Sequence, residues 1–144
     1  MKTSSAPKKL RGAGVYVFDT EARVLLIQRG PKARHQHYKW EGVGGQLEPG
    51  ETFEQAALRE FREELGIDVE LGAVLAEFEE ILDSNGTAWE AKIFQGSINQ
   101  VPQIQEPEKC VGLGWFTKAE VIQLSAIGLL ADYSVADFTH MGWL

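Results

Sequence analysis

Short runs of β-branched and aliphatic residues recur along the chain and predict strands. The first two runs, residues 12–18 (GAGVYVF) and 23–28 (RVLLIQ), are separated by residues 19–22, and we predict that they form a hairpin. A further run at residues 111–116 (VGLGWF) predicts another strand. The strands and helices do not alternate regularly, so the pattern favours a mixed sheet over a purely parallel one.

Residues 67–82 and 87–98 alternate apolar and polar positions and form a second predicted hairpin. Asn85-Gly86 lies between the two runs. This dipeptide is typical of a two-residue hairpin turn, because both residues tolerate positive φ angles.

The clearest helical pattern runs from Thr52 to Gly66. Thr52 and Gln55 have the spacing of a capping box, and Gly66 is placed to cap the C-terminal end. At 100° per residue, five apolar side chains fall within about 140° of arc and predict a stripe that faces the core. They are Phe53, Ala57, Leu58, Phe61 and Leu65.

The rest of the chain completes one domain. Residues 117–124 (TKAEVIQL) predict a short helix capped by Thr117, and the tail to Leu144 predicts another. A chain of 144 residues buries roughly two-thirds of its unfolded surface in a single core, so we expect one domain over residues 1–144. Residues 1–10 are basic and polar and are expected to be flexible. The predicted fold class is α/β (α+β), with a mixed sheet between helices.

The net charge of −7 is unevenly distributed along the chain. Residues 1–40 carry a balance of +7, whereas residues 41–80 carry −10. Such an acidic block repels itself unless solvent, the neighbouring basic segment or cations offset it. Nucleic acid is therefore disfavoured as a partner, but a small polyanionic ligand held through metal is compatible with this charge.

The sequence also favours a cytoplasmic protein without a membrane partner. No apolar stretch reaches 18 residues, and the N-terminal MKTSSAPKKLRG lacks the apolar run of a signal peptide. Cys110 is the single cysteine, which excludes an internal disulfide and fits a reducing compartment. The sequence is also compatible with a homodimer.

Three glutamates lie beside the apolar stripe of the predicted helix: Glu60, Glu63 and Glu64. Like charges three and four residues apart repel each other by roughly 0.2–0.5 kcal/mol per pair. A solvated acidic face is one interpretation. A bound Mg²⁺ ion is the other, because this cation takes oxygen ligands and often holds substrate phosphates through one or two carboxylates.

Residues 45–67, GQLEPGETFEQAALREFREELGI, resemble the Nudix box. That pattern is Gly, five residues, Glu, seven residues, Arg-Glu, a bulky apolar residue, any residue, Glu-Glu, any residue, Gly and a bulky apolar residue. Phe61 departs mildly from it, since an aliphatic residue is usual there. Every fixed position is met, by Gly45, Glu51, Arg59, Glu60, Glu63, Glu64 and Gly66.

The resemblance implies the Nudix fold, an α/β/α sandwich with a mixed sheet, and hydrolysis of a nucleoside diphosphate linked to another group. It implies Mg²⁺, with Mn²⁺ as the alternative. By resemblance, Arg59 and Glu51 are a supporting ion pair that fixes the loop onto the helix, as opposed to a surface pair of little energetic value. The implied metal ligands are the Gly44 carbonyl, Glu60, Glu63 and Glu64.

The general base has several candidates. Glu60 or Glu63 fits this role by resemblance, and in some family members an acid from a later loop has it. Glu106 and Glu108, in the segment EPEKCVGLGW, are the later acids here, and Glu108 is then also a candidate metal ligand. A plain acidic turn around Pro107 is the competing interpretation.

Substrate contacts are expected in the basic loop at residues 29–39 and in nearby aromatic residues, although a solvated loop explains the same composition. Arg29 and Lys39 are the first candidates for phosphate contacts, and Trp40 for stacking on a base. The other candidates are Lys32, Arg34, His35, His37, Tyr38 and Trp89.

Segments that mark several Nudix subfamilies are missing, so the chain resembles a MutT-type pyrophosphohydrolase that converts NTP or dNTP to NMP and pyrophosphate. The small-molecule partner is then a nucleotide. Hydrolysis of ADP-ribose, a nucleotide sugar or a 5′-triphosphate RNA end stays as an alternative. A module that senses nucleotides without cleaving them is the alternative that is not an enzyme.

Overall fold

The computed structural model describes residues 9–144 and contains a mixed four-stranded sheet. The parallel pair at its centre is β1 (Leu10–Val17) and β6 (Ala88–Ser97). The antiparallel strands β4 (Val43–Gln46) and β5 (Glu70–Leu82) complete the order β4-β1-β6-β5.

A second sheet of three antiparallel strands lies beside it. It contains β2 (Val24–Arg29), β3 (Trp40–Glu41) and β7 (Cys110–Phe116), in the order β3-β2-β7. The basic loop of residues 30–39 connects β2 to β3. The four-stranded sheet is the mixed sheet expected from the sequence, and the three-stranded sheet is an addition to it.

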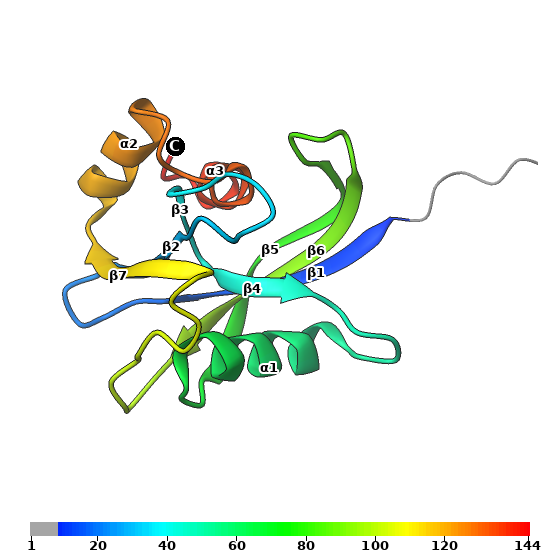
Figure 1. Ribbon diagram of the computed structural model, residues 1–144, viewed down its shortest axis with the longest axis horizontal. Coiled ribbons are helices and arrows are strands. Elements are labelled where there is room, and N and C mark those ends of the chain that lie inside the picture. Colours follow the sequence, from blue (N-terminus) through cyan, green and yellow to red (C-terminus); the bar gives the residue numbers. More distant parts are fainter. Residues whose placement is uncertain (1–8) are drawn as a thin grey trace, which may run out of the picture.

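Helices cover both sides of the strands and make the α/β/α arrangement. Helix α1 (Phe53–Leu65) lies below the strands in Figure 1. Helices α2 (Lys118–Ala126) and α3 (Asp132–His140) lie above them. One apolar cluster packs between α1 and the strands, and a second packs between the strands and helices α2 and α3. The predicted mixed α/β class is confirmed.

Helix α1 has the predicted ends. The Thr52 hydroxyl accepts from the Gln55 N–H, and the Gln55 side chain accepts from the Thr52 N–H. Gly66 ends the helix with φ 72°, in the left-handed region that glycine adopts without strain. The buried stripe includes Ala56, whereas the predicted Leu58 is 44% exposed.

The predicted hairpin over residues 12–28 is wrong. Asp19 does reverse the chain, since its Oδ1 accepts the N–H groups of Glu21 and Arg23. Beyond an isolated bridge between Phe18 and Val24, however, the two strands diverge into separate sheets. Local pattern cannot reveal this divergence, because both strands find their partners far along the chain.

The predicted hairpin of β5 and β6 is confirmed, with a longer loop than the predicted two-residue turn. Asp83 and Thr87 close it through a backbone hydrogen bond, and Gly86 has φ 77°. At the other end, most of the predicted flexible segment falls on residues 1–8, outside the described residues. Leu10 already belongs to β1.

Candidate active site

The site begins where β4 passes α1 at very short distance. A Cβ atom on Gly44 would lie 2.2 Å from the Ala13 carbonyl oxygen, and one on Gly45 would lie 2.5 Å from Cδ of Glu60. A side chain at Gly44 would meet backbone atoms, whereas one at Gly45 would force the Glu60 side chain to shift. The backbone of β4 is thereby held directly against the acidic edge of the helix.

Arg59 organises this edge through several charged hydrogen bonds. Its guanidinium binds Glu51 through Nε at 2.7 Å and Nη2 at 2.9 Å, and Nη2 also reaches the Gln46 carbonyl oxygen at 3.0 Å. Nη1 donates to Glu60 Oε1 at 2.7 Å and Glu63 Oε2 at 3.2 Å. The Arg59 hydrogen bonds lower the pKa of Glu51 to about 2, with help from the Glu48 N–H.

Glu64 lies on the inner side of the same edge and has an unsatisfied oxygen. Within residues 9–144, its Oε2 atom is buried and has no hydrogen-bond partner. Burial raises the pKa of Glu64 well above its ordinary value, and the charges of Glu41 and Glu60 raise it further, while the Gly44 N–H partly offsets them. Burial also raises the pKa of Glu60, although Arg59 opposes the shift. An unpaired buried carboxylate costs free energy until a cation or proton joins it.

The implied Mg²⁺ ion therefore fits the donor set, although the three glutamates are not arranged as a closed cage. Across residues 9–144, no three Asp, Glu, His or Cys side chains converge closely enough to hold an ion between them. Nη1 of Arg59 donates to one oxygen of Glu60 and one oxygen of Glu63. Glu64 Oε2 is the oxygen that stays without a partner.

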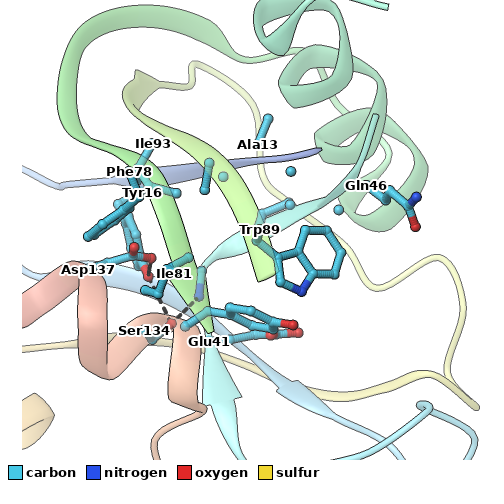
Figure 2. Close-up of a pocket in the computed structure, with 18 of the residues that line it drawn as sticks. Ala13, Tyr16, Glu41, Gln46, Phe78, Ile81, Trp89, Ile93, Ser134 and Asp137 are labelled. Carbon is cyan, nitrogen blue, oxygen red and sulfur yellow. Dashed lines mark hydrogen bonds between the residues drawn. The ribbon is translucent and has the colours of Figure 1, made fainter. Parts of the chain in front are cut away.

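A cavity of about 360 Å³ extends from Glu64 between the four-stranded sheet and α3 (Figure 2). Arg29 and Glu41 lie in its wall and form an ion pair of 2.8 Å. Burial raises the pKa of Glu41, and Arg29 opposes the shift. The apolar part of the wall consists of Ala13, Val43, Phe78, Ile81, Trp89, Ala91, Ile93 and Tyr133.

A buried polar network closes the end of the cavity near α3. The Tyr16 hydroxyl lies 2.8 Å from Ser134 Oγ and donates to Asp137 Oδ2 at 2.6 Å; Figure 2 marks these bonds. Ser134 Oγ also accepts the Gly42 N–H at 3.1 Å. Burial raises the pKa of Asp137 to about 7, against the opposing effect of the Tyr16 hydrogen bond. Tyr16, Ser134 and Asp137 line the cavity.

The comparisons agree with this geometry. The model of the NUDIX domain family matches residues 8–138. The chain belongs to the Nudix family. It is a Nudix pyrophosphohydrolase of the MutT type, as its sequence pattern predicts.

Named relatives support this assignment. The Nudix chain is 32% identical to "CTP pyrophosphohydrolase" of Escherichia coli K12 over 110 residues, which is 74% of this chain and 76% of that one. It is 48% identical to "8-oxo-dGTP diphosphatase" of Proteus vulgaris over 62 residues, 43% of this chain and 54% of that one. A crystal structure of a MutT NUDIX hydrolase from Burkholderia pseudomallei superposes with a TM-score of 0.78 at 27% identity, covering 92% of this chain and 98% of that one.

No helix within residues 9–144 of this Nudix domain is long and apolar enough to cross a membrane.

The substrate residues predicted for the Nudix domain are only partly brought together. Arg29 lines the cavity, as do Arg34 and His35 from the basic loop. Lys39 and Trp40 do not belong to the cavity wall. The Trp40 ring instead packs edge-on against Phe116, with 4.8 Å between the ring centroids, because the β3 strand turns it toward α2 and α3. This packing argues against Trp40 as a stacking residue.

The two acidic candidates from the later loop, Glu106 and Glu108, differ in burial and in their contacts. Glu108 is exposed, and its carbonyl oxygen, not its carboxylate, contacts the basic loop by accepting the Lys32 N–H. Glu106 is half-buried, and its charge contributes to the raised pKa of Glu64. Of the two, Glu106 is the one whose charge acts on a glutamate of the Nudix box.

Sequence reasoning missed the residues at the two ends of the cavity. Glu41 follows Trp40 directly and gave no signal of its own. Ser134 and Asp137 are three residues apart in the tail helix and buried beside Phe138. A polar pair at this spacing within an apolar helical face is the one pattern that indicates them.

Proposed function

We propose that this Nudix hydrolase cleaves a nucleoside or deoxynucleoside triphosphate to the monophosphate and pyrophosphate, with Mg²⁺ or Mn²⁺ as cofactor. The observation that carries the proposal is the buried Glu64 Oε2, which has no partner among the described residues. It lies beside the β4 backbone, where a Cβ on Gly45 would lie 2.5 Å from Cδ of Glu60. A carboxylate buried in this way is stabilised by a divalent cation.

The residues that would hold the ion are the Gly44 carbonyl, Glu60, Glu63 and Glu64. When bound there, the metal would neutralise charge on phosphate oxygens and lower the pKa of a water molecule. Arg59 and Glu51 position these ligands, since Arg59 joins the loop at Gln46 and Glu51 to the helix at Glu60. We keep Glu60 and Glu63 as candidates for the general base, with Glu106 as the later acid and Glu108 as the less favourable one.

The cavity beside Glu64 supports a nucleoside triphosphate as substrate. Its apolar wall offers a surface for a base, and Arg29, Arg34 and His35 offer cationic or polar contacts for a phosphorylated ligand. The names of the relatives, CTP pyrophosphohydrolase and 8-oxo-dGTP diphosphatase, point the same way. They favour a triphosphate over ADP-ribose, a nucleotide sugar, an RNA end or a sensing role.

A substrate panel tests this proposal. Ribonucleoside and deoxyribonucleoside triphosphates, 8-oxo-dGTP, ADP-ribose and UDP-glucose are each incubated with Mg²⁺ or Mn²⁺, and the products are separated by chromatography. We expect monophosphate and pyrophosphate from at least one triphosphate, with much slower turnover of the other compounds. Release of a nucleoside diphosphate and phosphate, or faster turnover of ADP-ribose, contradicts the proposal.

Two variants test whether this activity depends on the glutamates of the Nudix box. Glu63→Gln removes a charge from the site without removing a core contact, since Glu63 is exposed on α1. We expect its kcat to fall at least about 100-fold. Glu54→Gln removes an exposed charge from the first turn of the same helix and should leave kcat within about twofold.

A further inference from the structure

The loop between β5 and β6 is joined to α3 by the carboxylate of Asp83. One of its oxygens, Oδ1, accepts the backbone N–H groups of Asn85 and Thr87, both at 2.9 Å, and so fixes the loop. The other, Oδ2, accepts from the Trp89 indole Nε1 at 3.0 Å and from the Tyr133 hydroxyl at 3.3 Å. One carboxylate thus connects the tip of the hairpin to a strand and a helix.

Both aromatic rings that Asp83 holds belong to the cavity wall. They meet edge to face, with 5.8 Å between their centroids and an interplanar angle of 76°. Gly12 in the neighbouring strand leaves room for the indole, because a Cβ there would lie 3.2 Å from Trp89 Cε3. Figure 2 shows the indole on the side of the cavity away from Phe78 and Tyr16.

This wall has the chemistry that a planar base requires. Elsewhere in the same cavity Phe78 and Ile81 add apolar surface, while Asp137 and Ser134 place polar groups at its end. Bases stack on aromatic side chains whatever their sequence, and polar groups then contact their edges. Such stacking contributes more binding free energy when the ring is already held at a fixed angle, because binding then does not have to order the ring.

We propose that Asp83 is a positioning residue that holds Trp89 and Tyr133 as one aromatic wall on which the nucleobase of the substrate packs. This inference rests on the proposed nucleotide substrate. Asp83 itself does not line the cavity and acts through the two rings. Partial burial would raise the pKa of Asp83, but the hydrogen bonds from Trp89, Thr87 and Asn85 lower it below its ordinary value, so the carboxylate stays charged at neutral pH.

A binding titration tests the wall without any hydrolysis. Tryptophan emission is followed as AMP, CMP, GMP or UMP is added, and as ribose 5-phosphate is added as the ligand that lacks a base. We expect at least one nucleotide to quench the emission and ribose 5-phosphate not to. In Trp89→Phe the base-dependent quenching should disappear, since the remaining tryptophans at 40, 115 and 143 are outside the cavity wall.

The positioning role is tested with Asp83→Ala and a matched control, Ser84→Ala, which changes an exposed residue of the same loop. We expect Asp83→Ala to weaken nucleotide binding about tenfold, the value of one stacked base, and Ser84→Ala to leave it within about twofold. Tyr133→Phe removes one donor to Oδ2 but spares the loop contacts of Oδ1, so it separates loss of the wall from loss of the hairpin. Nucleotide binding by Tyr133→Phe should be weaker than that of the wild type, but less so than in Asp83→Ala.

Kinetics supply the second measurement. On the best triphosphate, Asp83→Ala should raise KM about tenfold and leave kcat within about twofold, because the contact exists in both the ground and transition states. Equal quenching by nucleotides and ribose 5-phosphate, unchanged quenching in Trp89→Phe, or equal binding by Asp83→Ala and Ser84→Ala would overturn the inference. If no triphosphate is hydrolysed but the titration behaves as expected, the proposed reaction fails and the aromatic wall stands.

Discussion

The Tyr16 hydroxyl donates a hydrogen bond of 2.6 Å to Asp137 Oδ2 and so joins the central strand β1 to helix α3. Both residues are buried, with exposed fractions of 1% and 5%. The same burial raises the pKa of Asp137 to about 7, whereas an unfolded chain has an aspartate pKa of about 3.9. The contact between strand and helix is therefore linked to pH.

We predict that Asp137 makes the protein less stable as the pH rises from about 4 to about 7. Its folded pKa is raised, so the folded state binds more protons than the unfolded state in this window, and the free energy of unfolding falls with rising pH. The slope from this residue is on the order of 1 kcal/mol per pH unit. The stabilisation is complete below pH 4 and lost above pH 7.

Urea unfolding of Asp137→Asn measures this contribution. The amide mimics the neutral acid and still accepts from Tyr16, so the wild type should lose more stability than the variant between pH 5 and pH 8. Asp132→Asn, at the start of the same helix, is the control. Identical pH profiles for Asp137→Asn and the wild type would show that the buried carboxyl does not titrate in this range.

The parts of the site that sequence predicts are those with local signals. Thr52, Gln55 and Gly66 specify the ends of α1, and the spacing of Arg59, Glu60 and Glu64 within one helix determines that they share an edge. The structure confirms these helix ends because each depends on residues a few positions away.

The rest depends on pairing between distant segments. Tyr16 and Asp137 are separated by 121 positions, and Asp83 and Tyr133 by 50. The division of β1 and β2 between two sheets likewise depends on β6 and β7, far along the chain. Trp40 has the aromatic ring that stacking on a base requires, but tertiary packing against Phe116 determines where that ring lies.

We predict that Arg59→Lys lowers both activity and stability. Lysine offers one ammonium group in place of the guanidinium that binds Glu51 through two nitrogens and also reaches Glu60 and the Gln46 carbonyl. Loss of these charged hydrogen bonds should cost about 2 kcal/mol of unfolding free energy. With the loop no longer fixed to α1, kcat should fall at least about tenfold.

Arg62→Lys is the matched control, because Arg62 is 63% exposed and pairs only with the exposed Asp68 among the described residues. Its unfolding free energy and kcat should stay close to those of the wild type. Equal losses in the two variants would mean that Arg59 acts as an ordinary surface cation.

Gly45→Ala is predicted to reduce activity more than stability. Its methyl group would lie 2.5 Å from Cδ of Glu60, so the side chain of Glu60 has to move while the backbone stays in place. Gly44→Ala would instead meet the backbone oxygen of Ala13 at 2.2 Å, which cannot yield locally, and should destabilise the sheet. Thermal unfolding and kcat, measured on both variants, separate the two effects.

Gly72→Ala is the control for these substitutions, because its Cβ would meet only the Gln95 carbonyl oxygen, at an ordinary 3.5 Å. It lies in β5 outside the cavity wall and should keep its activity. A folded Gly45→Ala variant with wild-type kcat would count against a role for the position of Glu60.

The last prediction concerns the unpartnered oxygen of Glu64. Burial and the neighbouring charges of Glu41 and Glu60 raise the pKa of Glu64 well above its ordinary value, so holding the carboxylate ionised costs free energy in the folded state. Glu64→Gln removes that charge. At pH 8 without metal the variant should therefore unfold at a higher temperature than the wild type.

Added Mg²⁺ should reverse the order. A ligand present at 100 times its dissociation constant stabilises a protein by about 2.7 kcal/mol, and the wild type should gain this stability in thermal unfolding. Glu64→Gln should gain less than half of it, while Glu54→Gln, changed on the exposed side of the same helix, should gain as much as the wild type. Equal gains by Glu64→Gln and the wild type would mean that the buried oxygen serves no cation, and the metal site would have to be sought around Glu60 and Glu63 alone.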